Sequence, residues 1–103
     1  MEKLVQCLNF SYKSSLKKAR RLLDDGEELK ALTWHINKMT AIVKDYSVCL
    51  SEDSFSCGCI AGRTARLCYH VIFFFLYFRE NEYSMPKEII KGMTKYVESR
   101  YGH

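Results

Sequence analysis

The sequence has little of what marks membrane-spanning, secreted or multidomain chains. Its longest apolar run, residues 71–78, is far shorter than the ~20 residues that cross a bilayer. The N-terminal residues contain no continuous apolar stretch and no small-residue cleavage site, so we expect no signal peptide. Proline occurs once, at Pro86, and no repeat, low-complexity stretch or linker divides the 103 residues. We therefore expect one soluble domain, residues 1–103, without membrane contact.

An even set of cysteines is also lacking, which argues against a disulfide-stabilised secreted protein. The five cysteines would leave one unpaired in any disulfide scheme. We expect an intracellular protein, cytoplasmic or, in a eukaryote, nuclear, and in a reducing compartment clustered cysteines more often bind metal. Apolar residues make up 48% and aromatic residues 14% of the chain, which excludes a disordered tail. The core of so small a domain is modest, and a structural metal ion would help to stabilise it.

Two pairs of metal-binding residue types lie close together in the chain. Residues 56–59 read Ser-Cys-Gly-Cys and, after eight further residues, residues 68–70 read Cys-Tyr-His. Thiolate sulfur and imidazole nitrogen suit the four-coordinate structural sites of zinc. We expect Gly58 to let the backbone bend so that both sulfurs reach one ion. Because residues two apart on a helix do not face each other, we expect a helix to begin just after the third cysteine. The sequence predicts one Zn²⁺ held by Cys57, Cys59, Cys68 and His70.

Other interpretations of the cysteines and histidines were weighed against this one. The four residues could be ordinary core and surface side chains, although the combined pattern favours metal. Redox chemistry by the first pair is a weaker alternative, because the usual motif is Cys-x-x-Cys beside a βαβ unit. Cys7 and Cys49 have no partner at suitable spacing and are predicted to be ordinary thiols. His35 and His103 complete no acyl-transfer signature, so we expect no catalysis and no small-molecule substrate.

Helical periodicity is clearest near the two ends of the chain. Leu16, Ala19, Leu22 and Leu23 predict a helix over residues 14–25, capped by Ser14 or Ser15 and ended by Gly26. Leu4, Val5 and Leu8 would form one face of a shorter helix before it. A second clear helix is predicted over residues 85–101, capped by Ser84, with Pro86 in its first turn.

Residues 29–50 fit two periodicities. Apolar residues recur at steps of three and four, as in a long helix, but they also alternate around Trp34 and around Val48. The content of Thr, Trp, Ile, Val and Tyr favours strands. We therefore predict three antiparallel strands, the first ending near Ile36, the second around residues 46–50 and the third around residues 55–59.

The pattern Cys-x-Cys, eight residues, Cys-x-His resembles the SWIM-type zinc finger. That family occurs in plant mutator-type transposases, some ubiquitin ligases and small archaeal or recombination-associated proteins. The resemblance covers about residues 16–78, through Lys18, Ala19, Leu22, Leu23, Gly26, Trp34, Ile36, Tyr46, Val48 and the start of the helix at His70-Val71. Tyr69 stands where many members carry a lysine. The resemblance implies a ββα zinc fold and a DNA-binding or protein-binding role without catalysis.

Two groups of basic residues suggest nucleic acid as a partner of this chain, whose net charge is +4. Lys13, Lys17, Arg20 and Arg21 form a basic face opposite the leucines of the first clear helix, and Arg63 and Arg66 lie between the two ligand pairs. Such clusters contact phosphates. The helix face could also be merely solvated, and the two loop arginines could offset the negative charge of the zinc centre. If DNA is the partner, we expect contacts from Arg63, Arg66, Lys17, Arg20 and Arg21.

Residues 71–78 are apolar on every side of the helix predicted after His70. Either the sheet and the helix of residues 85–101 cover it, or a leftover aromatic strip docks a partner. The second interpretation predicts a homodimer or heterodimer through this helix or the one after Pro86.

These predictions together describe an α+β zinc-binding domain. A three-stranded antiparallel sheet and a ββα finger occupy about residues 29–80, between flanking helices. The predicted function is non-catalytic, in DNA binding or DNA-associated protein interaction. The alternative is a protein-interaction adaptor, for example the partner of a recombinase-like ATPase, without direct nucleic-acid contact.

Overall fold

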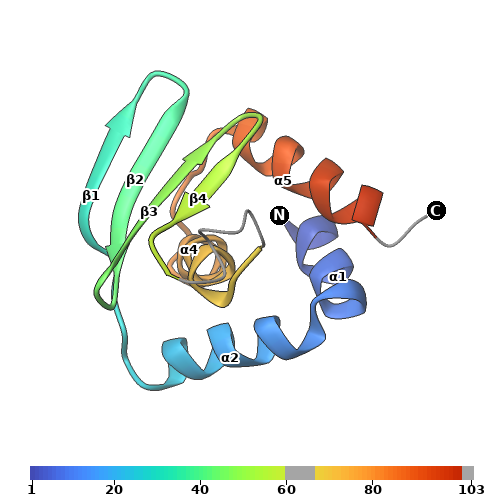
Figure 1. Cartoon of the computed structure of the whole chain (residues 1–103), viewed down its shortest axis with the longest axis horizontal. Helices are drawn as coiled ribbons and strands as arrows, with labels where there is room; N and C mark the ends of the chain where they lie inside the picture. Colours follow the sequence, from blue (N-terminus) through green and yellow to red (C-terminus); the bar gives the residue numbers. More distant parts are fainter. Residues whose placement is uncertain (60–66, 101–103) are drawn as a thin grey trace.

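The computed structural model describes residues 1–59 and 67–100 of the chain (Figure 1). Within them, the helices α1 (Glu2–Ser11) and α2 (Lys13–Asp24) come first. An antiparallel sheet follows, made of β1 (Lys30–His35), β2 (Lys38–Val43), β3 (Tyr46–Ser51) and β4 (Phe55–Cys57). Two further helices, α4 (Tyr69–Glu80) and α5 (Lys87–Arg100), complete this part of the chain. The architecture is α+β, as the sequence predicts.

The sheet has four strands in the order β1-β2-β3-β4, each paired with its neighbour in sequence. The prediction of three strands is therefore wrong, and residues 29–50 are not a helix. The missed strand is β2, which lies between two-residue turns at residues 36–37 and 44–45. Neither turn contains glycine or proline, although Lys44 has a φ of 58°, which hairpin turns usually assign to Gly, Asn or Asp. Asn37 and Asp45 are turn-forming residues, but the sequence lacks the Asn-Gly or Asp-Gly pair that marks such turns most clearly.

One face of the sheet packs against the helices. Its fully buried residues are Met39, Ala41, Val43, Val48 and Leu50. Trp34 lies opposite Met39 in the strand register, and its ring contacts Phe78 of α4 with 5.9 Å between centroids. Trp34 thus lies on the inner face, although it is half exposed. Ile36, predicted as the end of the first strand, lies in the turn after β1 and is 94% exposed, because the strand ends before it.

The end of α2 is a Schellman motif. The N–H of Gly26 donates to the carbonyl of Leu23, and the N–H of Glu27 donates to the carbonyl of Leu22, both at 3.0 Å. Gly26 has a φ of 80°, which glycine adopts without the steric cost of a side chain. The predicted end of this helix is confirmed. Its start is not: α2 begins at Lys13, so the predicted caps, Ser14 and Ser15, lie inside its first turn.

The helix α4 lies at the centre of the structure. Seen end-on in Figure 1, it has the sheet on one side and α2 on another, with α1 and α5 closing the remaining sides. Phe73, Phe74, Phe75 and Phe78 are all at most 1% exposed. Of the two interpretations of residues 71–78, the covered helix therefore describes these four rings, because α2 packs along α4 in addition to the sheet. Tyr77 of the same helix is half-buried. None of the helices in residues 1–59 and 67–100 is long and apolar enough to span a membrane.

The helix α5 begins at Lys87, three residues after the predicted cap, and the carbonyl of Pro86 accepts from the N–H of Ile90 at 3.3 Å.

The backbone of α5 closely approaches the turn between β3 and β4 at Gly92. A Cβ at Gly92 would lie 2.9 Å from the carbonyl carbon of Glu52 and nearer still to its oxygen. Glycine lowers helix propensity, and this approach explains its presence in the middle of α5.

We expect Gly92→Ala to lower the free energy of unfolding by about 1–3 kcal/mol. The added methyl group meets backbone atoms of Glu52 rather than a flexible side chain, and this outweighs the ~1 kcal/mol that alanine gains in helix propensity. Chemical denaturation measures the difference, with Lys95→Ala, at an exposed position of the same helix, as the control. Unchanged or increased stability of Gly92→Ala would show that α5 and the turn separate without cost.

Candidate metal centre

The four predicted ligands come from two places in the fold. Cys57 is the last residue of β4, and Cys59 follows two residues later. Cys68 is the N-cap of α4 and His70 is the second residue of that helix. The predicted position of the helix start relative to these two residues is confirmed. The centre therefore joins the end of the sheet to the beginning of the central helix.

The hairpin of β3 and β4 determines which cysteines face the interior. Cys57 pairs with Val48, whose side chain is fully buried, and the N–H of Gly58 donates to the carbonyl of Ser47 at 3.1 Å. Cys49 pairs with Ser56, one position along, so it points to the opposite face of the sheet. The alternation of the strands thus separates Cys57 from Cys49, although both lie on the same hairpin.

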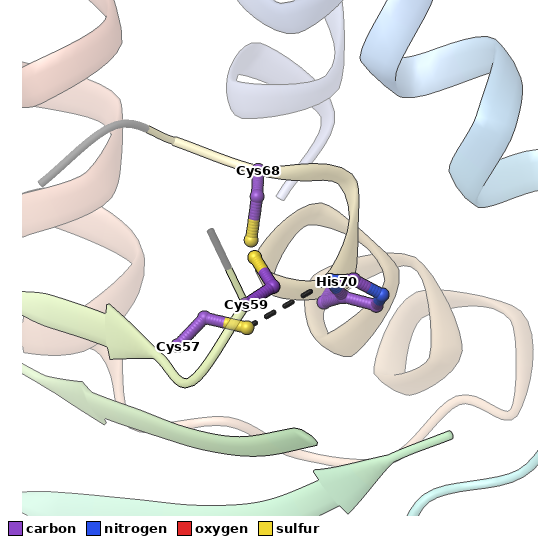
Figure 2. A group of neighbouring side chains, drawn as sticks. All are labelled: Cys57, Cys59, Cys68 and His70. Atoms are coloured by element: carbon purple, nitrogen blue, oxygen red, sulfur yellow. Dashed lines mark hydrogen bonds between the residues drawn. The ribbon is translucent and has the colours of Figure 1, made fainter. Parts of the chain in front are cut away.

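The ligand atoms are close enough for one ion. All four lie within 4.8 Å of one another, and the sulfurs point toward a common space beside the His70 ring (Figure 2). The Sγ of Cys57 is 3.7 Å from Nδ1 of His70. Metal–ligand bonds of about 2.3 Å to sulfur and 2.0 Å to nitrogen in a tetrahedral site place the ligand atoms roughly 3.5–3.8 Å apart. The cluster could therefore bind a metal ion after small side-chain movements.

Burial keeps the thiols of this cluster in their neutral form. The four side chains are 3–8% exposed. Burial raises the pKa of Cys57 to about 12, against the opposing effect of the Cys59 backbone N–H. Burial also raises the pKa of Cys68, while the backbone N–H of Val71 lowers it. A bound cation would displace these protons, because a coordinating thiol is deprotonated by the metal.

His70 is in the form and position of a ligand. Its burial, and secondarily the charge of Lys44, lower its pKa, so the imidazole is neutral, as metal binding requires. The rings of Tyr69 and Tyr46 lie 4.2 and 4.8 Å from its ring, between centroids. Its Nδ1 faces Cys57 and is the nitrogen placed to bind an ion. Its Nε2 is buried without a hydrogen-bond partner in the part of the chain that the structure describes, which is costly in a core.

The backbone bends at Gly58 and Cys59, just after β4, as the sequence predicts. The bend does not use the left-handed conformation that favours glycine, since among residues 1–59 and 67–100 Gly26 is the glycine with a positive φ. A Cβ at Gly58 would make ordinary contacts of 3.9 Å with the backbone of Ser47 and 4.0 Å with the ring of Tyr46. Position 58 therefore accepts a side chain, although the chain bends there.

The structure places the other predicted residues away from the metal centre. Cys7 is buried in α1, Cys49 is half-buried on the outer face of the sheet, and His35 is exposed at the end of β1. Neither of these cysteines belongs to the cluster. Arg63, Arg66 and His103 lie outside the described residues. Lys13, Lys17, Arg20 and Arg21 are exposed on α2, as predicted for its basic face.

Sequence reasoning missed three residues near His70. Tyr46 was predicted as a strand residue, Lys18 was noted for family resemblance alone, and Lys44 was not considered. The Nζ of Lys18 lies 5.7 Å from the ring centroid of Tyr69, and the Tyr69 ring in turn packs against His70. The positive φ of Lys44 depends on the turn, which the sequence does not mark. No local signal connects these residues to the cluster, because they come from three separate elements.

Comparison of the chain with protein-family models, with curated proteins and with solved structures gave no match. The likeness to SWIM-type fingers thus rests on the residue pattern. The geometry supports a zinc-finger-like site: four buried Cys and His side chains, within 4.8 Å of one another, that could hold a metal ion.

Proposed function

We propose that the chain is a zinc-binding module in which the ion is structural. The observation that supports this most is the closeness of three sulfurs and one imidazole nitrogen, all within 4.8 Å and all buried. Thiolate and imidazole together favour Zn²⁺ over Mg²⁺ or Ca²⁺, which prefer oxygen ligands. An ion here would tie β4 to α4.

We also propose that the module is not an enzyme. A catalytic zinc site has three protein ligands and keeps a position open for water or substrate, whereas four protein ligands close a structural site. All four side chains of this cluster are at most 8% exposed. In the rest of the described chain we find no catalytic Cys–His pair. Cys7 and Cys49 lie outside the cluster that contains His70, and His35 is exposed at the end of β1.

Nucleic acid is the partner that we propose for this module. Exposed basic residues crowd the outer face of α2, opposite its buried Leu16, Ala19 and Leu22. They are Lys13, Lys17, Lys18, Arg20 and Arg21. Charge of one sign on one helix face attracts phosphates. The resemblance of the ligand pattern to SWIM-type fingers supports the same assignment, with DNA as the nucleic acid.

Salt dependence tests this assignment. We expect the zinc-loaded protein to bind DNA at low salt, and Lys17→Gln with Arg21→Gln to weaken binding to all sequences. Each lost phosphate contact should reduce the slope of log K against log salt by ~0.9 on duplex DNA or ~0.7 on a single strand. Lys91→Gln with Lys95→Gln, which removes two exposed charges from α5, is the control. Absence of DNA binding at low salt would contradict the proposal.

A protein-interaction adaptor is the second candidate, and a surface other than the predicted one favours it. Trp34 is 50% exposed and Tyr83 is 53% exposed, and both rings pack against the buried Phe78, at 5.9 and 5.7 Å. Half-exposed Trp and Tyr are typical of interfaces. Sedimentation at micromolar concentration, repeated with Trp34→Ala, would reveal a dimer that depends on this surface.

A further inference from the structure

Two lysines from separate elements flank a row of rings over the metal centre. The Nζ of Lys18, on α2, lies 5.7 Å from the ring centroid of Tyr69. The Tyr69 ring packs on His70, and His70 packs on Tyr46 at the start of β3. Lys44 lies in the turn just before Tyr46. We name this surface the Lys18–Lys44 strip.

We propose that the Lys18–Lys44 strip binds a single strand of nucleic acid, with both lysines on phosphates and Tyr46 stacked against a base. This inference rests on the proposed nucleic-acid function and names the surface and the form of nucleic acid. The basic outer face of α2 alone would serve duplex and single strand alike. An aromatic ring between two positive charges favours a single strand over a duplex, because the bases of a single strand are free to stack on the ring.

The backbone at Lys44 indicates a role for its charge. Lys44 has a φ of 58°, a conformation that costs roughly 1–2 kcal/mol for a residue with a side chain. In a two-residue hairpin turn, Gly, Asn or Asp would avoid most of this cost. A lysine at such a position calls for a reason outside the turn, and strained positions of this kind gather at functional sites.

The residues of the strip differ in their exposure to solvent. His70 is 3% exposed, whereas Tyr46 is 39% exposed and both lysines are exposed. The charged and aromatic groups that could meet a strand thus lie outside the imidazole, which belongs to the metal centre. Asp45 is the acidic residue of the same turn, and its carboxylate would oppose a phosphate at this end of the strip.

The competing explanation is that the lysines serve the metal centre. Three thiolates and Zn²⁺ carry a net charge of about −1, which nearby ammonium groups would offset. Under this explanation, removal of both lysines weakens metal retention. It changes the affinity for nucleic acid only as much as removal of two lysines elsewhere on the surface does. The two explanations therefore differ in a measurable way.

The test compares Lys18→Gln with Lys44→Gly against a control with the same net charge, Lys91→Gln with Lys95→Gln. Glycine suits the positive φ at position 44, so the variant should fold. Zinc-loaded proteins are titrated into labelled oligodeoxythymidine, and zinc content is measured on the same samples. On a single strand, each phosphate contact contributes ~0.7 to the slope of log K against log salt, which corresponds to about fivefold in affinity at roughly 0.1 M salt relative to 1 M. The strip variant loses two such contacts, so we expect it to bind about 25-fold more weakly. The control pair should bind like the unchanged protein, and Asp45→Asn should bind more tightly.

Four results would overturn the inference. If the unchanged protein binds DNA and the strip variant binds like the control, the strip is not the contact, while the proposed function stands. If the strip variant loses its zinc, the lysines belong to the metal centre. If a duplex of matched length binds more tightly than the single strand, Tyr46 does not stack on a base. Failure of the unchanged protein to bind any DNA would contradict the inference and the proposed function together.

Discussion

Replacing Cys57 with serine is expected to abolish metal binding and to unfold most of the chain. Binding of structural zinc contributes about 10–16 kcal/mol in small domains, which is as large as the entire stability of a typical domain, about 5–15 kcal/mol. The buried serine cannot replace the thiolate, so the link between β4 and α4 is lost. Circular dichroism and metal analysis of the purified variant, with and without added zinc, measure both effects.

Cys49→Ser is the matched control for this prediction. It is the same substitution on the same hairpin, but Cys49 is half-buried on the opposite face of the sheet and outside the cluster. We expect this variant to hold one zinc per chain and to keep its fold, and a chelator to unfold it as it unfolds the unchanged protein. Full zinc occupancy in Cys57→Ser, or loss of zinc in Cys49→Ser, would contradict the assignment of the centre.

Phe74→Ala is expected to lower the free energy of unfolding by about 3–5 kcal/mol. The Phe74 ring is fully buried in α4 and stacks on Phe78 at 5.6 Å between centroids. Its truncation removes apolar contacts on all sides and leaves a cavity in a rigid core. Chemical denaturation of the zinc-loaded protein measures the change.

Tyr77→Ala on the same helix provides the comparison. Tyr77 is half-buried, so part of its ring already contacts water and its truncation should cost clearly less. If Phe74→Ala and Tyr77→Ala cost the same small amount, α4 is not enclosed by α1, α2 and the sheet as the structure places it.

The four residues of the candidate metal centre could be predicted because their pattern is local. All four lie in residues 57–70, and the ligand preferences of zinc together with the geometry of a helix start sufficed to place Cys68 before α4 and His70 in its first turn. The bend at Gly58 is also present. The backbone there has no positive φ, and the sequence cannot show which glycines use their conformational freedom.

The number of strands could not be predicted because the hairpin turns are only weakly marked. Each has a single turn-forming residue, Asn37 or Asp45, and neither contains glycine or proline, so β1, β2 and β3 read as one continuous stretch with both helical and alternating periodicity. Pairing between strands decides the matter. Met39, Ala41 and Val43 share a face with Val48 and Leu50 only when the chain reverses at residues 44–45, and Trp34 lies opposite Met39 only when it also reverses at residues 36–37.

The sequence by itself determined the four residues of the candidate metal centre, the end of α2 at Gly26 and the presence of an apolar helix after His70. Each depends on residues that are near one another in the chain. Only the tertiary structure decided which sides of α4 are covered, how closely α5 approaches Glu52 at Gly92, and that Lys18 and Lys44 flank the rings over His70. These features depend on contacts between elements far apart in sequence, and local periodicity contains no information about which faces those elements present to one another.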